Sequence, residues 1–329
     1  MKERDKTLDI AKGIFIILVV LGHSAFPYTD VIYWFHMPAF FIISGLLYKE
    51  NTLKLVKLAV TLFVPFLTYV IINVLVRYFT NPDFSGIADM LMLLERHLYN
   101  GKMIGGVYWY IPVFFLTKVA FDFAHRILKK HVWVLMIISY FVAHYISINF
   151  VPDRENFANT NLTLILPWDV DVVLIAVWYY FIGVLLRKRG KQIYSNKKVI
   201  LLTFVLSTAF LISNYLFDLN YFFDMKYSYY KSLLLDTTVP VIFTLFFLGI
   251  SSLIAETKHD FGLSFVGQKS LYIMFLHIPI CANILQLDNY FLYTIVGVIT
   301  PLLFAYVVEK NKFLTFLFTG KGIPLFLSK

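Results

Sequence analysis

The sequence predicts an all-α, polytopic integral membrane protein with about ten transmembrane helices and with both termini on the cytoplasmic side. Hydrophobic residues make up 59% of the 329 residues and charged residues only 15%, whereas soluble domains carry about 25% charged residues. The mean hydropathy is +0.73. A water-soluble fold of this length could not bury so many apolar side chains, so we expect the lipid bilayer to solvate most of them.

Ten stretches of the chain have the roughly 17–25 mostly apolar residues that a transmembrane helix needs. Their approximate bounds are 8–25, 32–48, 56–76, 107–124, 132–151, 170–187, 199–217, 233–255, 270–287 and 290–308. Outside them, residues 87–98 are expected to form an interfacial helix and residues 313–326 an amphipathic or re-entrant tail. We find no internal repeat, so we expect residues 1–329 to form a single transmembrane domain.

The distribution of Lys and Arg predicts the orientation of these spans, because cytoplasmic loops carry an excess of positive charge. Of the 29 Lys and Arg residues, 21 fall in the termini and the even-numbered loops, six fall in the odd-numbered loops, and Lys12 and Lys118 lie inside spans. The net charge of +9 is therefore interpreted as membrane topology and not as nucleic acid binding.

The first span carries three polar residues that a membrane helix rarely contains: Asp9, Lys12 and His23. The eleven residues from Lys12 to His23 make three turns plus about 20°, so all three lie on one face, with His23 about 16 Å farther out. Such a face should line a protein-enclosed channel or cavity. The alternative is an interfacial pair of Asp9 and Lys12, with His23 as an ordinary interior residue.

The second and ninth spans each place a proline two residues after a histidine, in His36-Met37-Pro38 and in His277-Ile278-Pro279. Pro38 either releases a backbone carbonyl near Trp34 or marks the start of a helix. Irregular backbone at membrane depth is tolerated only inside protein or beside a wet cavity. His36 is thus a candidate site residue, although it could instead belong to an interfacial aromatic belt.

The remaining polar residues give weaker signals. The single Cys281 excludes an internal disulfide and a metal site built from several thiolates, and the histidines show no spacing typical of a metal site, so no metal is predicted. Five carboxylates lie near span ends, where we expect them to cap helices or to be solvated. They are Asp122, Asp169, Asp171, Asp236 and Glu309.

Five segments of the sequence together resemble the acyltransferase-3 family of membrane acyltransferases, in particular its fucose 4-O-acetylase-like branch. They are Leu8–Gly13 with Val19–His23, Trp34–Pro38 continuing to Ser44-Gly45, Val107–Pro112, Tyr180–Gly183 with Arg187-Lys188, and Ser270–Tyr272 with Leu276–Pro279. Many members of the family have arginine where this chain has Lys12. Lysine keeps the charge but loses the bidentate geometry of arginine.

The resemblance implies transfer of an acetyl group from cytoplasmic acetyl-CoA to a hydroxyl of a cell-surface or lipid-linked glycan, in a multi-pass protein of the bacterial-type plasma membrane. His23 would act as the general base, because an alcohol is a poor nucleophile at neutral pH. His36 would orient this step or carry the acyl group transiently, and Lys12 and Asp9 would bind the coenzyme. The expected substrate pocket consists of Tyr33, Trp34, Trp109, Tyr110 and His277.

The main alternative function is a non-enzymatic exporter or flippase of a glycan or lipid. Transporters also use polar stripes and proline-broken helices to build central sites. The lack of an internal repeat favours the enzyme, and binding or hydrolysis of acetyl-CoA would distinguish the two functions.

Overall fold

The computed structural model describes residues 5–82, 86–104, 106–152, 164–217 and 219–322. Within these ranges the chain is helical, apart from loops and one isolated β-bridge between Asp224 and Tyr229. The helices are α1 (Lys6–Gly22), α2 (Thr29–Tyr33), α3 (His36–Leu46), α4 (Leu55–Thr80), α5 (Ile87–Tyr99), α6 (Tyr110–Leu128), α7 (Val132–Phe150), α9 (Val170–Leu186), α10 (Gly190–Tyr194), α11 (Lys197–Leu216), α12 (Leu235–Glu256), α13 (Leu263–Gln268), α14 (Ser270–Ile278), α15 (Tyr290–Val308) and α16 (Lys312–Thr319). The prediction of an all-helical protein is confirmed.

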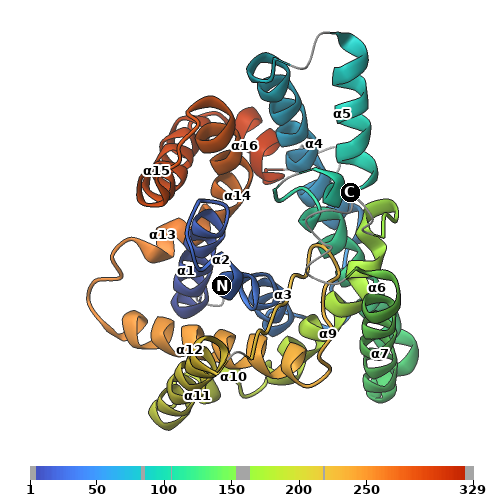
Figure 1. Ribbon diagram of the computed structural model, residues 1–329, viewed down its shortest axis with the longest axis vertical. Coiled ribbons are helices and arrows are strands. Elements are labelled where there is room, and N and C mark those ends of the chain that lie inside the picture. The colour runs from blue at the N-terminus through green and yellow to red at the C-terminus, as the bar shows by residue number, and fades with distance from the viewer. Residues whose placement is uncertain (1–4, 83–85, 105, 153–163, 218, 323–329) are drawn as a thin grey trace.

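The first three helices lie in the middle of the molecule, and the later helices surround them (Figure 1). Helix α1 contacts α12, α13, α14 and α15, and α3 contacts α9 and α12. The N-terminal helices therefore form the centre of the bundle, while α5, α7 and α11 lie at its periphery (Figure 1).

Six helical segments of the described chain are long and apolar enough to cross a membrane, as expected for a multi-pass membrane protein. They are Leu55–Thr80, Tyr110–Phe150, Pro167–Leu186, Lys197–Leu216, Leu235–Glu256 and Tyr290–Val308. The segment Tyr110–Phe150 contains two helices, α6 and α7, which are separated at Lys129, where φ is +48°. Ten spans with both termini in the cytoplasm stay a prediction.

The predicted second and ninth spans are not continuous α-helices. Helix α2 ends at Tyr33 and α3 begins at His36, so Pro38 lies in the first turn of α3, where its missing N–H group costs nothing. Helix α14 ends at Ile278 and continues as a π-helical turn over Pro279–Ile284. Each proline thus coincides with an irregularity next to a histidine.

Glycine pairs allow the closest contacts between helices. A Cβ atom on Gly45 would lie 2.0 Å from the carbonyl oxygen of Tyr180, and one on Gly183 would lie 2.0 Å from that of Ile42. Helices α3 and α9 therefore touch backbone to backbone, as small residues permit in membrane proteins. Gly13 on α1 and Gly267 on α13 form a second close contact of this kind.

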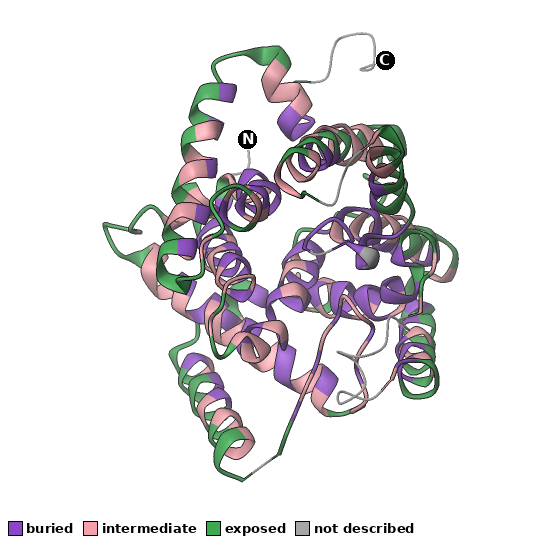
Figure 2. Cartoon of the chain, turned by 45° about the horizontal axis from the view of Figure 1, so that its top comes forward, coloured by how far each residue is buried: buried purple, intermediate pink, exposed green. Residues whose placement is uncertain are grey.

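Apolar side chains both fill the centre and cover the outside of the bundle. Phe35 stacks on Phe243 and Phe247 of α12, with ring centroids 4.9 and 5.2 Å apart, and Tyr69 of α4 stacks on Phe275 of α14 at 4.5 Å. Figure 2 shows buried residues gathered in the middle and exposed residues on the outer faces of the peripheral helices. Exposed faces rich in Leu, Phe and Ile are what lipid contact requires.

The expectation for carboxylates at span ends was wrong for four of the five. Asp236 is fully buried and accepts hydrogen bonds from His144, Tyr221 and the backbone N–H of Ser232, which replace water. Asp171 is buried in a salt bridge with Lys102. Asp169 makes no capping hydrogen bond to its own helix; it accepts from the N–H of Gly101 instead. Asp122 is buried and paired with Arg126, whereas Glu309 stays partly exposed beside Lys269.

The two predicted amphipathic segments have different outcomes. Residues 87–98 do form a helix, α5. The C-terminal run forms α16, which ends at Thr319 and packs on α4. The last part of that run, residues 323–326, lies outside the described residues.

Candidate functional site

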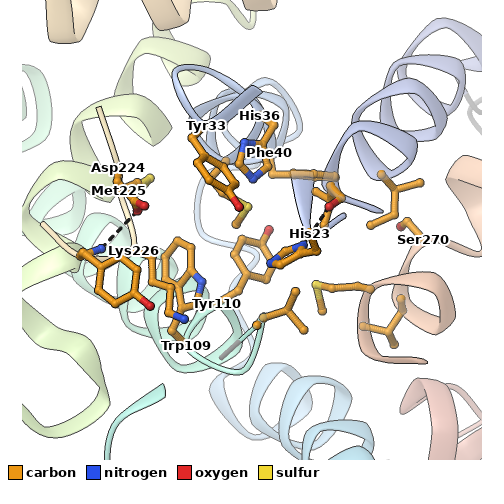
Figure 3. A pocket seen from close by; sticks show the side chains of 18 residues that line it. His23, Tyr33, His36, Phe40, Trp109, Tyr110, Asp224, Met225, Lys226 and Ser270 are labelled. Carbon is orange, nitrogen blue, oxygen red and sulfur yellow. Dashed lines mark hydrogen bonds between the residues drawn. The ribbon is translucent and has the colours of Figure 1, made fainter. Parts of the chain in front are cut away.

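A cavity of about 280 Å³ lies among α1, α2, α3, the start of α6, α14 and the loop between α11 and α12. The side chains that line it include two histidines, several aromatic residues and one pair of opposite charges (Figure 3). Its full lining is Ile16, Val19, His23, Tyr33, His36, Met37, Phe40, Gly106, Val107, Trp109, Tyr110, Asp224, Met225, Lys226, Tyr227, Ser270, Leu271 and Met274.

His23 follows the last residue of α1 and lines this cavity. Its Nδ1 donates a hydrogen bond to the carbonyl oxygen of Val19 at 2.8 Å. Because a carbonyl oxygen only accepts, Nδ1 carries the proton, and the neutral ring has its lone pair on Nε2. His23 can therefore act as a base through Nε2.

His277 lies directly behind His23 and does not line the cavity. It is fully buried, and its Nδ1 donates to the carbonyl oxygen of Ile273 at 2.8 Å. The lone pair of its neutral ring is thus on Nε2, which lies 3.3 Å from Nδ1 of His23. Nε2 of His277 is a second acceptor for the Nδ1 proton of His23.

His36 lines the same cavity from the first residue of α3. Its Nδ1 donates to the carbonyl oxygen of Ile32 at 2.6 Å, so its lone pair is also on Nε2. The ring of Tyr33 lies 5.4 Å from that of His36, and its hydroxyl donates to the carbonyl oxygen of Gly22 at 2.5 Å. This hydrogen bond links α2 to the end of α1 and holds the short segment between the two histidines.

Aromatic side chains form the floor between the charged and the histidine sides of the cavity. Trp109 and Tyr110, at the start of α6, both line it, with ring centroids 6.1 Å apart (Figure 3). Trp34, in contrast, is not among the lining residues. Its fully buried ring packs against Phe210, Tyr221 and Phe243 in the apolar core.

A charged wall, formed by Asp224 and Lys226 in the loop between α11 and α12, completes the cavity. Lys226 Nζ donates to the carbonyl oxygen of Ile104 at 3.0 Å, and Asp224 accepts from the N–H of Tyr227 at 3.3 Å. Burial lowers the pKa of Lys226 to about 8 and raises the pKa of Asp224. Lys226 is one of the six basic residues that fall in the predicted odd-numbered loops, and no site role was predicted for it from the sequence.

The amino-acid composition of this loop is a signal in the sequence from which the wall could have been predicted. Residues 221–230 hold six aromatic residues in ten positions, which is unusual for a loop in water. Such a loop is expected to fold back onto the protein, and Tyr221, Phe223 and Tyr230 are indeed buried.

A second cavity, of about 540 Å³, lies where α3 leads into α4, against α6. Four lysines contribute to its lining: Lys49, Lys54, Lys57 and Lys118. The predicted coenzyme residues Lys12 and Asp9 line neither cavity, and Asp9 is buried near Gln268 of α13, whose amide nitrogen lies 3.5 Å away.

Helix α6 connects the two cavities. Tyr110 lines the first and Lys118 lines the second. Phe114 lies between them, stacked on Tyr110 at 5.4 Å and beneath Nζ of Lys118 at 5.3 Å. Eight residues of helix separate Tyr110 from Lys118 by about 12 Å.

This arrangement has the chemical groups for proton transfer beside an aromatic pocket. It offers two imidazole bases, and the described residues contain no group of three or more His, Cys, Asp or Glu side chains that could hold a metal ion. Acid–base catalysis by histidine is the chemistry that such a site can perform.

Comparison with known proteins gives three findings. A family model described as an acyltransferase domain matches residues 5–310. The nodulation protein NolL of Sinorhizobium fredii is 34% identical over 155 residues, and that of Mesorhizobium japonicum is 28% identical over 151 residues. Each match covers 40% of this chain and 40% or 39% of the relative, so the chain spans about two-fifths of the length of these curated relatives. No solved structure matches significantly.

Proposed function

The chain belongs to the acyltransferase-3 family, and we propose on that premise that it is a membrane O-acyltransferase that moves an acetyl group from cytoplasmic acetyl-CoA to a hydroxyl of a cell-surface or lipid-linked glycan. The observation that carries this proposal is the single cavity shared by His23 and His36, whose Nδ1 atoms both donate to backbone carbonyls. Both neutral rings thereby keep Nε2 available as a base next to aromatic side chains.

His23 is the proposed general base. Its Nε2 removes the proton from the acceptor hydroxyl as the hydroxyl oxygen attacks the thioester carbonyl carbon. The carbon–sulfur bond then breaks, and the proton passes from His23 to the departing thiolate, so the products are the O-acetyl sugar and free coenzyme A. His36 orients the acceptor by accepting a hydrogen bond from a second hydroxyl, and His277 holds the ring of His23 from behind.

The lysine-lined cavity is the proposed site for the nucleotide end of acetyl-CoA. The positive charges of its lysines are opposite to the negative charges of the coenzyme's phosphates. Lysine binds phosphate strongly because the hydrogen bonds are charge-assisted. The thioester arm would follow α6 past Phe114 to His23. We prefer this site to Lys12 and Asp9, because neither of them lines the two cavities described above.

The proposed function also implies a location and an orientation in the membrane. The chain, 1–329, would act as one transmembrane domain in a bacterial-type plasma membrane, with both termini in the cytoplasm. The excess of Lys and Arg in the termini and even-numbered loops supports this orientation.

The test is acetyl transfer from labelled acetyl-CoA in intact membranes with the variant His23→Ala. We expect activity to fall by about 10²–10⁴-fold, the usual contribution of a general base. Mass spectrometry of surface glycan from cells with the variant should lack the increment of about 42 daltons that replacement of a hydroxyl hydrogen by acetyl adds. Undiminished transfer would exclude His23 from the reaction. Wild-type protein that moves glycan without binding acetyl-CoA would indicate an exporter instead.

A further inference from the structure

We propose that Asp224 and Lys226 form the acceptor subsite and that they select an uncharged sugar ring through its hydroxyl groups. This inference rests on the proposed acyl transfer and names the class of acceptor. Apart from its histidines, the cavity is lined by one acidic and one basic side chain, which are two residues apart in the same loop.

Both side chains keep unused hydrogen-bonding capacity. Lys226 has three donors, of which one reaches the carbonyl oxygen of Ile104. Asp224 has two oxygens, and Oδ1 accepts from the N–H of Tyr227. The backbone thus fixes both groups and leaves donors and acceptors for a ligand. A pair of neighbouring hydroxyls fits such a wall, because one hydroxyl can donate to the carboxylate while the other accepts from the ammonium.

The wall is held in place before any ligand binds. Ser228, two residues after Lys226, donates to Asp171, and Lys102 pairs with Asp171 in a buried cluster. Lys226 also lies over the ring of Tyr227, 4.8 Å from its centroid. A preorganised wall avoids the entropy cost of ordering a loop on binding, which suits a recognition site.

Charge and size define the ligand. The opposite charges of Asp224 and Lys226 cancel, so the wall offers no net positive charge that would offset the desolvation of an acceptor with its own carboxylate or phosphate. The cavity of about 280 Å³ is at the lower limit of the roughly 300–1,000 Å³ of ligand pockets, so it accommodates one ring. Trp109 and Tyr110 offer aromatic faces to the apolar side of that ring.

The position of the wall agrees with a role in acceptor binding. Figure 3 shows Asp224 and Lys226 on one side of the cavity and His23 on the other, with Trp109 and Tyr110 between them. A ring held over the aromatic floor would direct one hydroxyl to His23 and others to the charged wall. The wall would therefore decide which sugar, and which hydroxyl, is presented for acetylation.

The experiment measures acetyl transfer by the full chain in membranes, with labelled acetyl-CoA as donor and with methyl galactoside, methyl fucoside and methyl galacturonide as acceptor probes. We expect the two uncharged glycosides to be better acceptors than the uronide. The variants Asp224→Asn and Lys226→Met should each raise the KM of the uncharged glycosides about tenfold and leave the KM of acetyl-CoA unchanged. An unchanged donor KM also shows that the variants are folded.

Lys231 provides a matched control. Its Nζ also donates to a backbone carbonyl, that of Val151 at 3.1 Å, and also lies over a tyrosine ring, Tyr229, at 5.0 Å, but it does not line the cavity. Lys231→Met should leave the acceptor KM unchanged.

Three outcomes would overturn the subsite alone: preference for the uronide, an acceptor KM that is equally affected by Lys231→Met, or turnover of acetyl-CoA with no acetylation of any glycoside. Failure of the wild-type protein to bind or turn over acetyl-CoA would overturn the proposed function, and the subsite with it.

Discussion

The Nδ1 proton of His23 has two possible hydrogen-bond acceptors, one in its own helix and one in a different helix. The carbonyl oxygen of Val19 belongs to the same helix, so this contact would exist in α1 alone. Nε2 of His277 belongs to α14, 254 residues away in sequence, and is present only in the folded bundle. The sequence predicted His277 as a pocket residue, but it does not line the cavity. In the proposed mechanism it positions His23.

Substitution of His277 separates this role from a role in substrate binding. His277→Leu removes the acceptor and should lower kcat roughly five- to tenfold, the equivalent of one hydrogen bond, with the acceptor KM unchanged. His277→Gln keeps an acceptor oxygen near the position of Nε2 and should restore most of the activity. Steady-state kinetics with an uncharged glycoside measure both effects. A raised acceptor KM in His277→Leu would instead indicate contact with the substrate.

The charge of Lys226 predicts a pH dependence of acceptor binding. Burial lowers its pKa to about 8, an effect that Arg77 and Lys102 strengthen and that Asp224 and Asp169 oppose. A lowered pKa means that the ammonium is present below about pH 8 and is lost above it. The acceptor KM should therefore be constant at lower pH and rise between pH 8 and 9.

The variant Lys226→Arg tests this assignment, because arginine stays protonated throughout this range. Its acceptor KM, measured from pH 6.5 to 9.5, should show no rise above pH 8. If the arginine variant keeps the rise of the wild type, another group is responsible.

Residue patterns predicted part of the site. The face of α1 that carries His23 does line the cavity, with Ile16 and Val19. The sequence could not show where this cavity ends. Helix α13 packs on α1 so closely that a Cβ on Gly13 would lie 2.1 Å from the carbonyl oxygen of Leu263, and this contact is near Lys12. Tertiary packing, which periodicity does not report, separates Lys12 from the cavity.

At the scale of elements, α6 carries residues of both proposed subsites. Tyr110 and Lys118 lie two turns apart on one face, with Phe114 between them. One rigid helix therefore fixes the distance between the acceptor side and the lysine-lined cavity. In the proposed mechanism this distance sets how far the thioester arm of the coenzyme must extend.

The lysine-lined cavity predicts which substitutions weaken donor binding. Lys54→Gln and Lys57→Gln should each raise the KM of acetyl-CoA up to about tenfold, because a charge-assisted hydrogen bond to phosphate is lost. The acceptor KM should not change, and added salt should weaken donor binding in the wild type more than in the variants. Lys310→Gln is the control, since this exposed lysine lies outside both cavities. A larger effect from Lys12→Gln would favour the donor site predicted from the sequence.

The elements that hydropathy predicted poorly are those next to the site. Helix α3 has only 11 residues and α14 only nine before its π-helical turn. A helix enclosed by other helices does not need to span the bilayer, because neighbouring protein can satisfy the backbone at its ends. The two proline signals correctly located these irregular points. The loop over 221–230 was missed because loops are assumed to face water.

At the scale of the whole molecule, the predicted orientation can be tested because Cys281 is the single cysteine and is buried. In a Cys281→Ser background, new cysteines at Tyr28 and Asn289 lie in predicted outer loops, and those at Thr52 and His259 in predicted cytoplasmic loops. A membrane-impermeant maleimide should label the first pair in intact cells and the second pair only after permeabilisation. The opposite pattern would invert the topology, and a mixed pattern would change the number of spans.

The central position of α1, α2 and α3 has a consequence for biosynthesis. These helices leave the ribosome first, yet their neighbours α9 and α12 to α15 are translated much later. Until those helices arrive, the stretch with Asp9 and His23 faces lipid or translocation machinery at considerable energetic cost. Assembly of the proposed catalytic site must therefore await nearly complete translation, and a nascent chain released before α12 would contain both proposed catalytic histidines without a pocket around them.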